Sequence, residues 1–244
     1  MLKEPAHNFD GMSVTTETAS ASELPDEAPA GTEPVVVKPW WRGRIHQGAF
    51  FVSLPAGAAL IAISEGAAAH VAAICFALSL AALFGTSALY HRGNWTPHVR
   101  AKLQRADHAM IFVPIAGSYT PITLLAMRPA WGIALLAVVW TIAVVGVTLA
   151  LSRFGVLSRV GGFMYIGMGW LVIIALPMIL QSLGTTELVL MFAGGVLYTL
   201  GAIGLATRRP NPSPRLFGYH EVWHVMTVAG ASCHFALVAH LVHP

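Results

Sequence analysis

Seven long apolar stretches, separated by short polar segments, account for most of this 244-residue chain. Each holds about the 20 apolar residues that a helix needs to cross the hydrocarbon core of a bilayer. Prolines within the first, third and fifth stretches should kink those helices or open them locally. The pattern therefore predicts an all-α membrane protein, a seven-transmembrane helix bundle. The expected spans are residues 47–64, 67–90, 107–127, 130–151, 160–182, 187–206 and 219–242.

The first 39 residues differ in composition from the rest of the chain. The whole sequence is 56% hydrophobic and only 10% charged, whereas a soluble domain carries about 25% charged residues. Most of the 11 acidic residues lie in this N-terminal segment, which is also rich in Pro, Ser and Thr and lacks hydrophobic periodicity. Such a composition is typical of disorder, and without a basic start followed by an apolar run we expect no cleaved signal peptide. We expect a disordered acidic cytoplasmic tail over residues 1–39 and one membrane domain over residues 40–244.

The charges that flank the spans predict the orientation of the bundle. With the single exception of Arg128, the 14 lysines and arginines lie in the N-terminal segment or in connections on the same side of the membrane. Loops rich in Lys and Arg stay in the cytoplasm. We therefore expect a cytoplasmic N-terminus and, after seven spans, a C-terminus outside, in the inner (plasma) membrane. The basic balance reflects this flanking charge and does not indicate nucleic-acid binding.

Ionisable groups gather at the ends of three spans that this topology places on one side. His91 closes the second span, Asp107 opens the third, and His220 and His224 open the seventh. His220 and His224 are four residues apart and share a helix face, as do Ser87 and His91. Ionisable groups at membrane depth are costly and usually functional. Three imidazoles beside a carboxylate match an open zinc site, so we expect Zn²⁺ as the cofactor, although imidazole also binds Cu, Fe and Ni.

Simpler interpretations exist for these groups. A histidine at the end of a span can be an interfacial residue that water satisfies, Asp107 can be a helix N-cap, and Ser87 can serve helix packing. His220 to His224 also spells the H-E-x-x-H pattern of zinc proteases. In that case Glu221 would be the general base and Asp107 the third ligand, which leaves the nearby histidine of the second span without a task.

The remaining histidines fit such a site less well. His234 shares a face with His220 but lies about 21 Å deeper along the helix, so we expect it to serve core packing or a hydrogen bond between helices. His46 and His98 are expected at the membrane interface, and His108 points about 100° away from Asp107.

Several motifs spread over residues 40–242 form a specific combination. They are Ser87-Ala-Leu-Tyr-His91, Asp107-His108, Gly117-Ser-Tyr-Thr-Pro121, Phe217-Gly-Tyr-His-Glu-Val-Trp-His224 and Cys233-His-Phe235. Together they resemble the hemolysin III family, the bacterial branch of the progestin and adipoQ receptor (PAQR) group.

The resemblance implies a seven-helix bundle with a cytoplasmic N-terminus and a zinc ion held by three histidines. His91, His220 and His224 fall on those ligand positions, Asp107 on the carboxylate that holds the water at the zinc, and Ser87 on the serine one turn before the first ligand. The first span begins Arg44-Ile-His-Gln-Gly48, which departs from the family's Asn-containing Thr-His-Gly version. No role is therefore assigned to the histidine in that segment.

Three functions remain open. The wider group is similar to alkaline ceramidases, so the first hypothesis is zinc-dependent hydrolysis of a membrane-lipid amide or ester, with Asp107 passing the proton and Ser87 beside it. The second is a receptor-like or membrane-regulating protein in which zinc only staples helices together. The third is a hemolysin-type pore-forming cytolysin, which we rank last because no span shows a polar stripe that would line a wide channel.

Overall fold

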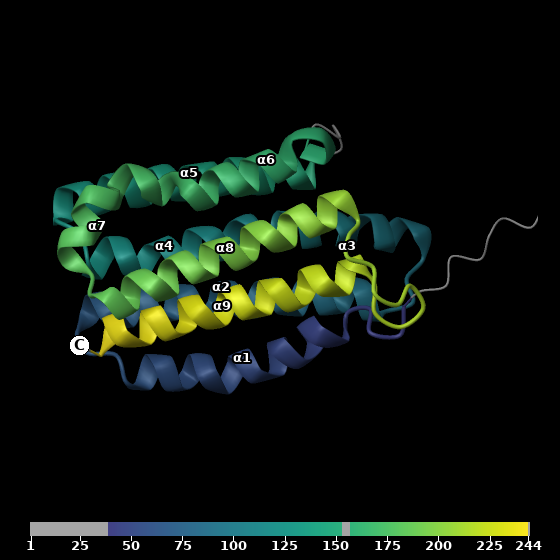
Figure 1. The fold of residues 1–244 in the computed structure, drawn as a ribbon, viewed down its shortest axis with the longest axis horizontal. Coiled ribbons are helices and arrows are strands. Elements are labelled where there is room, and N and C mark those ends of the chain that lie inside the picture. Colours follow the sequence, from purple (N-terminus) through teal and green to yellow (C-terminus); the bar gives the residue numbers. More distant parts are fainter. Residues whose placement is uncertain (1–38, 153–156, 244) are drawn as a thin grey trace, which may run out of the picture. The chain divides into compact units, whose positions relative to one another are not determined.

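The computed structural model describes residues 39–152 and 157–243, and for residues 157–162 only the backbone is described. The predicted tail therefore lies, apart from Pro39, outside the described residues. Within them the chain is all-α, with one isolated bridge between Ser213 and Phe217. The helices shown in Figure 1 are α1 (Arg44–Ala62), α2 (Ala67–Arg92), α3 (Pro97–Ala109), α4 (Phe112–Leu125), α5 (Pro129–Leu151), α6 (Leu157–Trp170), η1 (Leu171–Ala175), α7 (Leu176–Ser182), α8 (Thr185–Thr207) and α9 (Tyr219–Val242).

Seven helical segments among the described residues are long and apolar enough to cross a membrane, which confirms the predicted number of spans. Five of them are single helices, namely α1, α2, α5, α8 and α9. The third span joins α3 to α4, and the fifth joins the end of α6 to η1 and α7. In Figure 1 the segments run side by side as a bundle, with α8 next to α9 and with α5 and α6 on the edge opposite α1.

The third span starts earlier than the hydrophobic pattern predicted. Its first helix, α3, begins at Pro97 instead of residue 107, and proline is well suited to the first position of a helix. The first part of α3 is polar and basic, with Arg100 and Arg105 among its residues, so it carries no apolar signal. Asp107 consequently lies in the last turn of α3, and the interpretation of Asp107 as a helix N-cap is wrong.

Prolines open two of the spans, as predicted, but not the first. Pro114 has no N–H to bond the carbonyl of Met110, and the helix is interrupted at Met110 and Ile111, between α3 and α4. Pro177 follows the 3₁₀ segment η1 that interrupts the fifth span. Pro55, by contrast, lies inside α1, which is continuous.

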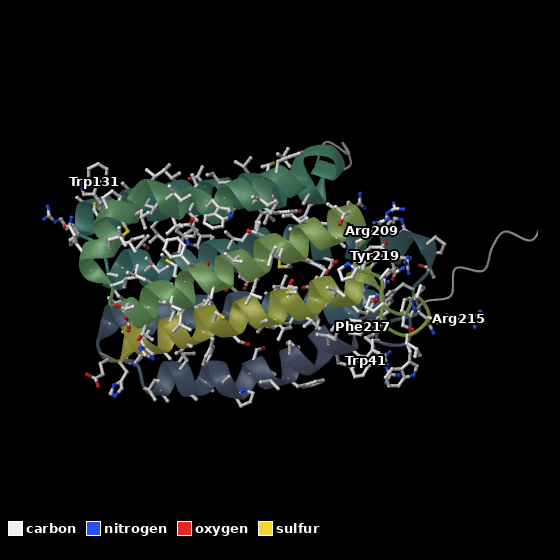
Figure 2. All side chains as sticks on the ribbon, in the orientation of Figure 1. Trp41, Trp131, Arg209, Arg215, Phe217 and Tyr219 are labelled. Carbon is white, nitrogen blue, oxygen red and sulfur yellow. The ribbon has the colours of Figure 1, made fainter. Side chains whose placement is uncertain are left out.

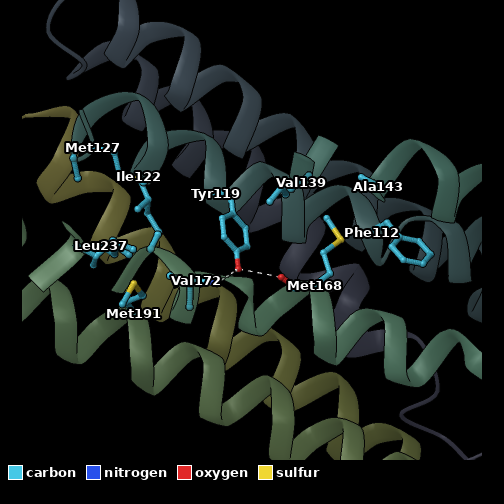
Figure 3. Close-up of a cluster of buried hydrophobic side chains, with 14 of the residues drawn as sticks. Phe112, Tyr119, Ile122, Met127, Val139, Ala143, Met168, Val172, Met191 and Leu237 are labelled. Carbon is cyan, nitrogen blue, oxygen red and sulfur yellow. Dashed lines mark hydrogen bonds between the residues drawn. The ribbon is translucent and has the colours of Figure 1, made fainter. Parts of the chain in front are cut away.

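Tyr119 of α4 satisfies the backbone where the fifth span opens. Its hydroxyl accepts a hydrogen bond from the N–H of Val172 at 2.7 Å and lies 3.0 and 2.9 Å from the carbonyl oxygens of Met168 and Gly169, to either of which it can donate. No water is available in the hydrocarbon core to satisfy such groups. Figure 3 shows the ring within a buried cluster that also holds Phe112, Ile122, Val139, Ala143, Met168, Val172, Met191 and Leu237. Tyr119 thus stabilises a helix break at membrane depth.

Two chain segments meet at one end of the bundle. Just before α1, the backbone N–H groups of Trp40 and Trp41 donate to the carbonyls of Arg215 and Leu216 in the α8–α9 connection, both at 3.2 Å. Figure 2 shows Trp41, Arg209, Arg215, Phe217 and Tyr219 at this end and Trp131 at the other. Aromatic side chains at both ends fit the two interfacial belts of a membrane protein. We call the end that holds the α2–α3 and α8–α9 connections the basic end; its cytoplasmic location remains a prediction.

Candidate metal centre

The last turns of α2 place two of the predicted residues at the basic end. Ser87 and His91 are four residues apart and face the same way, and their side chains are buried. Gly43, the residue before α1, packs directly on His91. It has a φ of +77°, and a Cβ atom at this position would lie 2.6 Å from the Cβ of His91. Both the left-handed backbone and the close approach require glycine here.

The first turns of α9 place two more histidines at the same end. The carboxylate of Glu221 accepts a hydrogen bond from the N–H of Gly218 at 2.9 Å, which fixes the start of the helix as a capping box does. His220 and His224 then lie on one face of α9, with ring centroids 4.7 Å apart. His224 is almost fully buried, and His220 is half-buried.

The three histidines predicted as ligands come together. One ring nitrogen of each of His91, His220 and His224 lies within 4.8 Å of the others, so the group could hold a metal ion. The Nε2 atoms of His91 and His220 are 3.2 Å apart. Two nitrogens bound to one tetrahedral zinc at its usual bond length would be about 3.3 Å apart. This pair has the spacing of two ligands of one ion, whereas the group as a whole spans up to 4.8 Å, so a bound ion would draw the rings closer together. Imidazole nitrogens suit zinc, and the choice of zinc over other metals remains a prediction.

Asp107 lies beside these histidines. Its Oδ2 is 3.8 Å from Nε2 of His91, and the side chain of Ser87 is close enough to act on its carboxyl group. Both side chains line the same cavity. A carboxylate in this position can accept a proton from a water molecule that reaches the three imidazoles. The structure thus brings together all five residues singled out in the sequence, and their chemical roles remain predictions.

Glu221 is engaged elsewhere, although it belongs to the H-E-x-x-H pattern. Its side chain is fully buried, one oxygen lies 2.5 Å from Nε of Arg42, and the other accepts the bond from Gly218. Both oxygens are therefore committed to holding the start of α9 and the segment before α1. This geometry does not favour the zinc-protease interpretation, in which Glu221 would act as a free general base.

His46 also reaches this site, which was not predicted from the sequence. We expected it at the membrane interface, but it is 3% exposed. Its ring stacks on that of His224, with centroids 3.8 Å apart and planes 14° apart. The topology carried the signal, because the start of the first span lies on the same side as the end of the second. Because the segment around His46 departs from the family pattern, its sequence predicted no role for this residue.

A cavity of about 170 Å³ leads from these residues into the bundle. Its polar end is lined by His46, Ser87, Asp107, His220 and His224. Further in, the walls come mostly from apolar side chains of α4, η1 and α8, among them Ile115, Ile122, Val172, Met191 and Phe192. An elongated apolar molecule with a polar head at the histidines would match this distribution.

His234 lines the deeper part of the same cavity. Its Nε2 lies 3.3 Å from the carbonyl oxygen of Met191 on α8, so the ring can donate a hydrogen bond between helices. It is not part of the group that could hold a metal ion. The prediction that it lies too deep for the metal centre, and serves an interhelical hydrogen bond, is confirmed.

The chain is similar to known proteins over most of its length. A family model described as "Haemolysin-III related" matches residues 35–235. "Hemolysin-3" of Bacillus cereus is 32% identical over 196 residues, which cover 79% of this chain and 86% of that protein. The "Hemolysin-3 homolog" of Bacillus subtilis (strain 168) is 32% identical over 201 residues, covering 79% of this chain and 89% of that protein. The region matched by the family model includes every residue of the metal centre.

Proposed function

We propose that this chain, which belongs to the haemolysin-III related family, is a zinc-dependent hydrolase of membrane-lipid amides or esters. Three histidines that could hold a metal ion lie at one end of a cavity whose walls are mostly apolar. The observation that carries the proposal is the shared location of three imidazoles, one carboxylate and a cavity with mostly apolar walls. The basic end, to which the site belongs, would face the cytoplasm, so the substrate would come from the cytoplasmic leaflet of the plasma membrane.

The residues of the centre divide the work of such a reaction. His91, His220 and His224 would hold Zn²⁺ and leave one tetrahedral position open. When bound, the ion would polarise the substrate carbonyl and make water more acidic. Asp107 would accept the proton of the attacking water and return it to the amine or alcohol as the C–N or C–O bond breaks. Ser87 would keep the Asp107 carboxylate oriented through its hydroxyl.

The decisive experiment supplies long-chain lipid amides and esters to the purified, zinc-loaded protein in detergent. We expect Asp107→Asn to retain its zinc and lose at least about a hundredfold in turnover, the usual contribution of acid–base catalysis. Glu65→Gln is the matched control, because this exposed carboxylate lies at the opposite end of the bundle. Equal turnover by wild type and Asp107→Asn would refute the proposed role of Asp107.

A non-enzymatic function has a structural observation in its favour. The three histidines belong to α2 and α9, so a bound ion would join two spans that are distant in sequence. Metal ligation of this kind can stabilise a fold without any catalysis. A receptor-like or membrane-regulating protein would then lose thermal stability on removal of zinc and would turn over none of the lipids offered.

The names of the relatives suggest a lytic function as well. Two proteins at 32% identity are called hemolysins, which would correspond to a pore-forming cytolysin. The walls of the cavity beyond its polar end are mostly apolar, unlike the lining of a water-filled channel. Release of an entrapped dye from liposomes that contain the purified protein would support this function over hydrolysis.

A further inference from the structure

His46 is a buried polar side chain that has no role in the proposed reaction. Neither of its ring nitrogens makes a hydrogen bond of acceptable geometry with the described residues. The backbone of His224 is close enough to act on the ring, but no hydrogen bond forms between them. A neutral imidazole always carries one N–H donor and one acceptor, and buried polar groups are nearly always paired. A partner for His46 is therefore expected in the cavity that it lines.

The stacking of the rings excludes His46 as a further ligand of the same ion. The lone pair of an imidazole nitrogen lies in the plane of its ring, so an ion bound to His224 lies in the plane of His224. The ring of His46 is nearly parallel to that plane, with its centroid 3.8 Å away. The lone pair of His46 would therefore lie in a plane parallel to that of His224 and would not point at such an ion. Zinc needs a nitrogen at about 2 Å, which His46 could not supply. The partner of His46 would therefore be a group other than the ion, at the polar end of the cavity that His46 lines.

We propose that His46 donates a hydrogen bond to an oxygen of the polar head of an acyl ligand, next to the oxygen that the metal centre holds. A carboxylate or ester head offers such a second oxygen, and the apolar walls beyond it suit the chain of the same molecule. His46 would then act as a binding residue that selects oxygen-rich heads. The inference rests on the acyl-ligand part of the proposed function and is independent of turnover.

The test measures equilibrium binding of palmitate to the full-length, zinc-loaded protein in detergent by calorimetry, with the zinc content determined for each variant. His46→Phe keeps a flat ring against His224 but removes both nitrogens. We expect it to keep its zinc and to bind palmitate about tenfold or more weakly, the usual effect of losing a hydrogen bond to a charged group. His46→Gln restores an N–H donor and should recover part of the affinity. His70→Phe is the matched control, because this exposed histidine lies at the opposite end of the bundle.

Each other result has a definite meaning. Equal palmitate affinity in wild type and His46→Phe would overturn the inference, and so would loss of zinc from both His46 variants, because His46 would then serve the metal instead. Failure of the wild type to bind palmitate would overturn both the inference and the lipid part of the proposed function. Binding that depends on His46 in a protein that hydrolyses no lipid would support the inference and contradict the hydrolase.

Discussion

At the scale of the residue, the ion pair between Arg42 and Glu221 carries the clearest stability prediction. Glu221 is fully buried, and Arg42 is the cation in contact with it. Arg42→Ala would leave a buried carboxylate without its cation, which typically costs about 3–5 kcal/mol. We expect a large loss in the free energy of unfolding, measured by denaturation in detergent. Arg92→Ala, an exposed arginine at the same end, is the control and should change the stability by about 0.5 kcal/mol or less.

The same pair shows which residue-level features the sequence could reveal. Ser87, His91 and the two histidines of α9 could be predicted because spacing along one helix places them on one face, and topology then joins the helix ends. The partner of Glu221 could not, since Arg42 is 179 positions away and no periodicity relates the two. His46 was within reach of the topological rule, but its burial depends on stacking against His224, which only the packed helices determine.

At the scale of the element, the break in the fifth span depends on one hydroxyl from a neighbouring helix. Tyr119→Phe would leave the N–H of Val172, and whichever of the two carbonyls accepts the hydroxyl proton, without this partner at membrane depth. A buried unsatisfied polar group costs about 1–3 kcal/mol, so the apparent melting temperature should fall clearly. Tyr165→Phe also removes a hydroxyl, one that bonds the carbonyl of His108 at an exposed position. A loss with Tyr165→Phe as large as with Tyr119→Phe would show that the break does not need Tyr119.

Hydrophobic patterning predicted the elements well where the membrane determines the pattern. All seven spans are found, and most of their ends agree within a few residues. The pattern failed at the start of α3, because the first part of this helix is polar and basic and therefore gives no apolar signal. The pattern also could not show which side chain forms hydrogen bonds with the backbone groups at the break in the fifth span. Tyr119, which belongs to one of the family motifs, forms these hydrogen bonds, and its partner Val172 lies 53 positions away in the sequence.

At the scale of the whole molecule, several contacts tie distant parts of the chain together at the basic end. Backbone hydrogen bonds join the segment before α1 to the α8–α9 connection, Arg42 pairs with Glu221, and Gly43 packs on the end of α2. A metal ion at the histidine group would add a bond between α2 and α9. The site thus lies where three spans are already held, which keeps the ligands close before an ion arrives.

This arrangement predicts that the metal stabilises the folded bundle. An ion that binds only the folded state adds about 2.7 kcal/mol when its free concentration is a hundred times its Kd. Chelation should therefore lower the apparent melting temperature of the wild type, and added Zn²⁺ should restore it. In His220→Ala/His224→Ala the chelator should have no effect, because the group has lost two of its three ligands. If the double variant responded to chelation as the wild type does, the stabilising metal would lie elsewhere. The three histidines of the wild type would then come together without an ion, through contacts such as the one between His91 and His220.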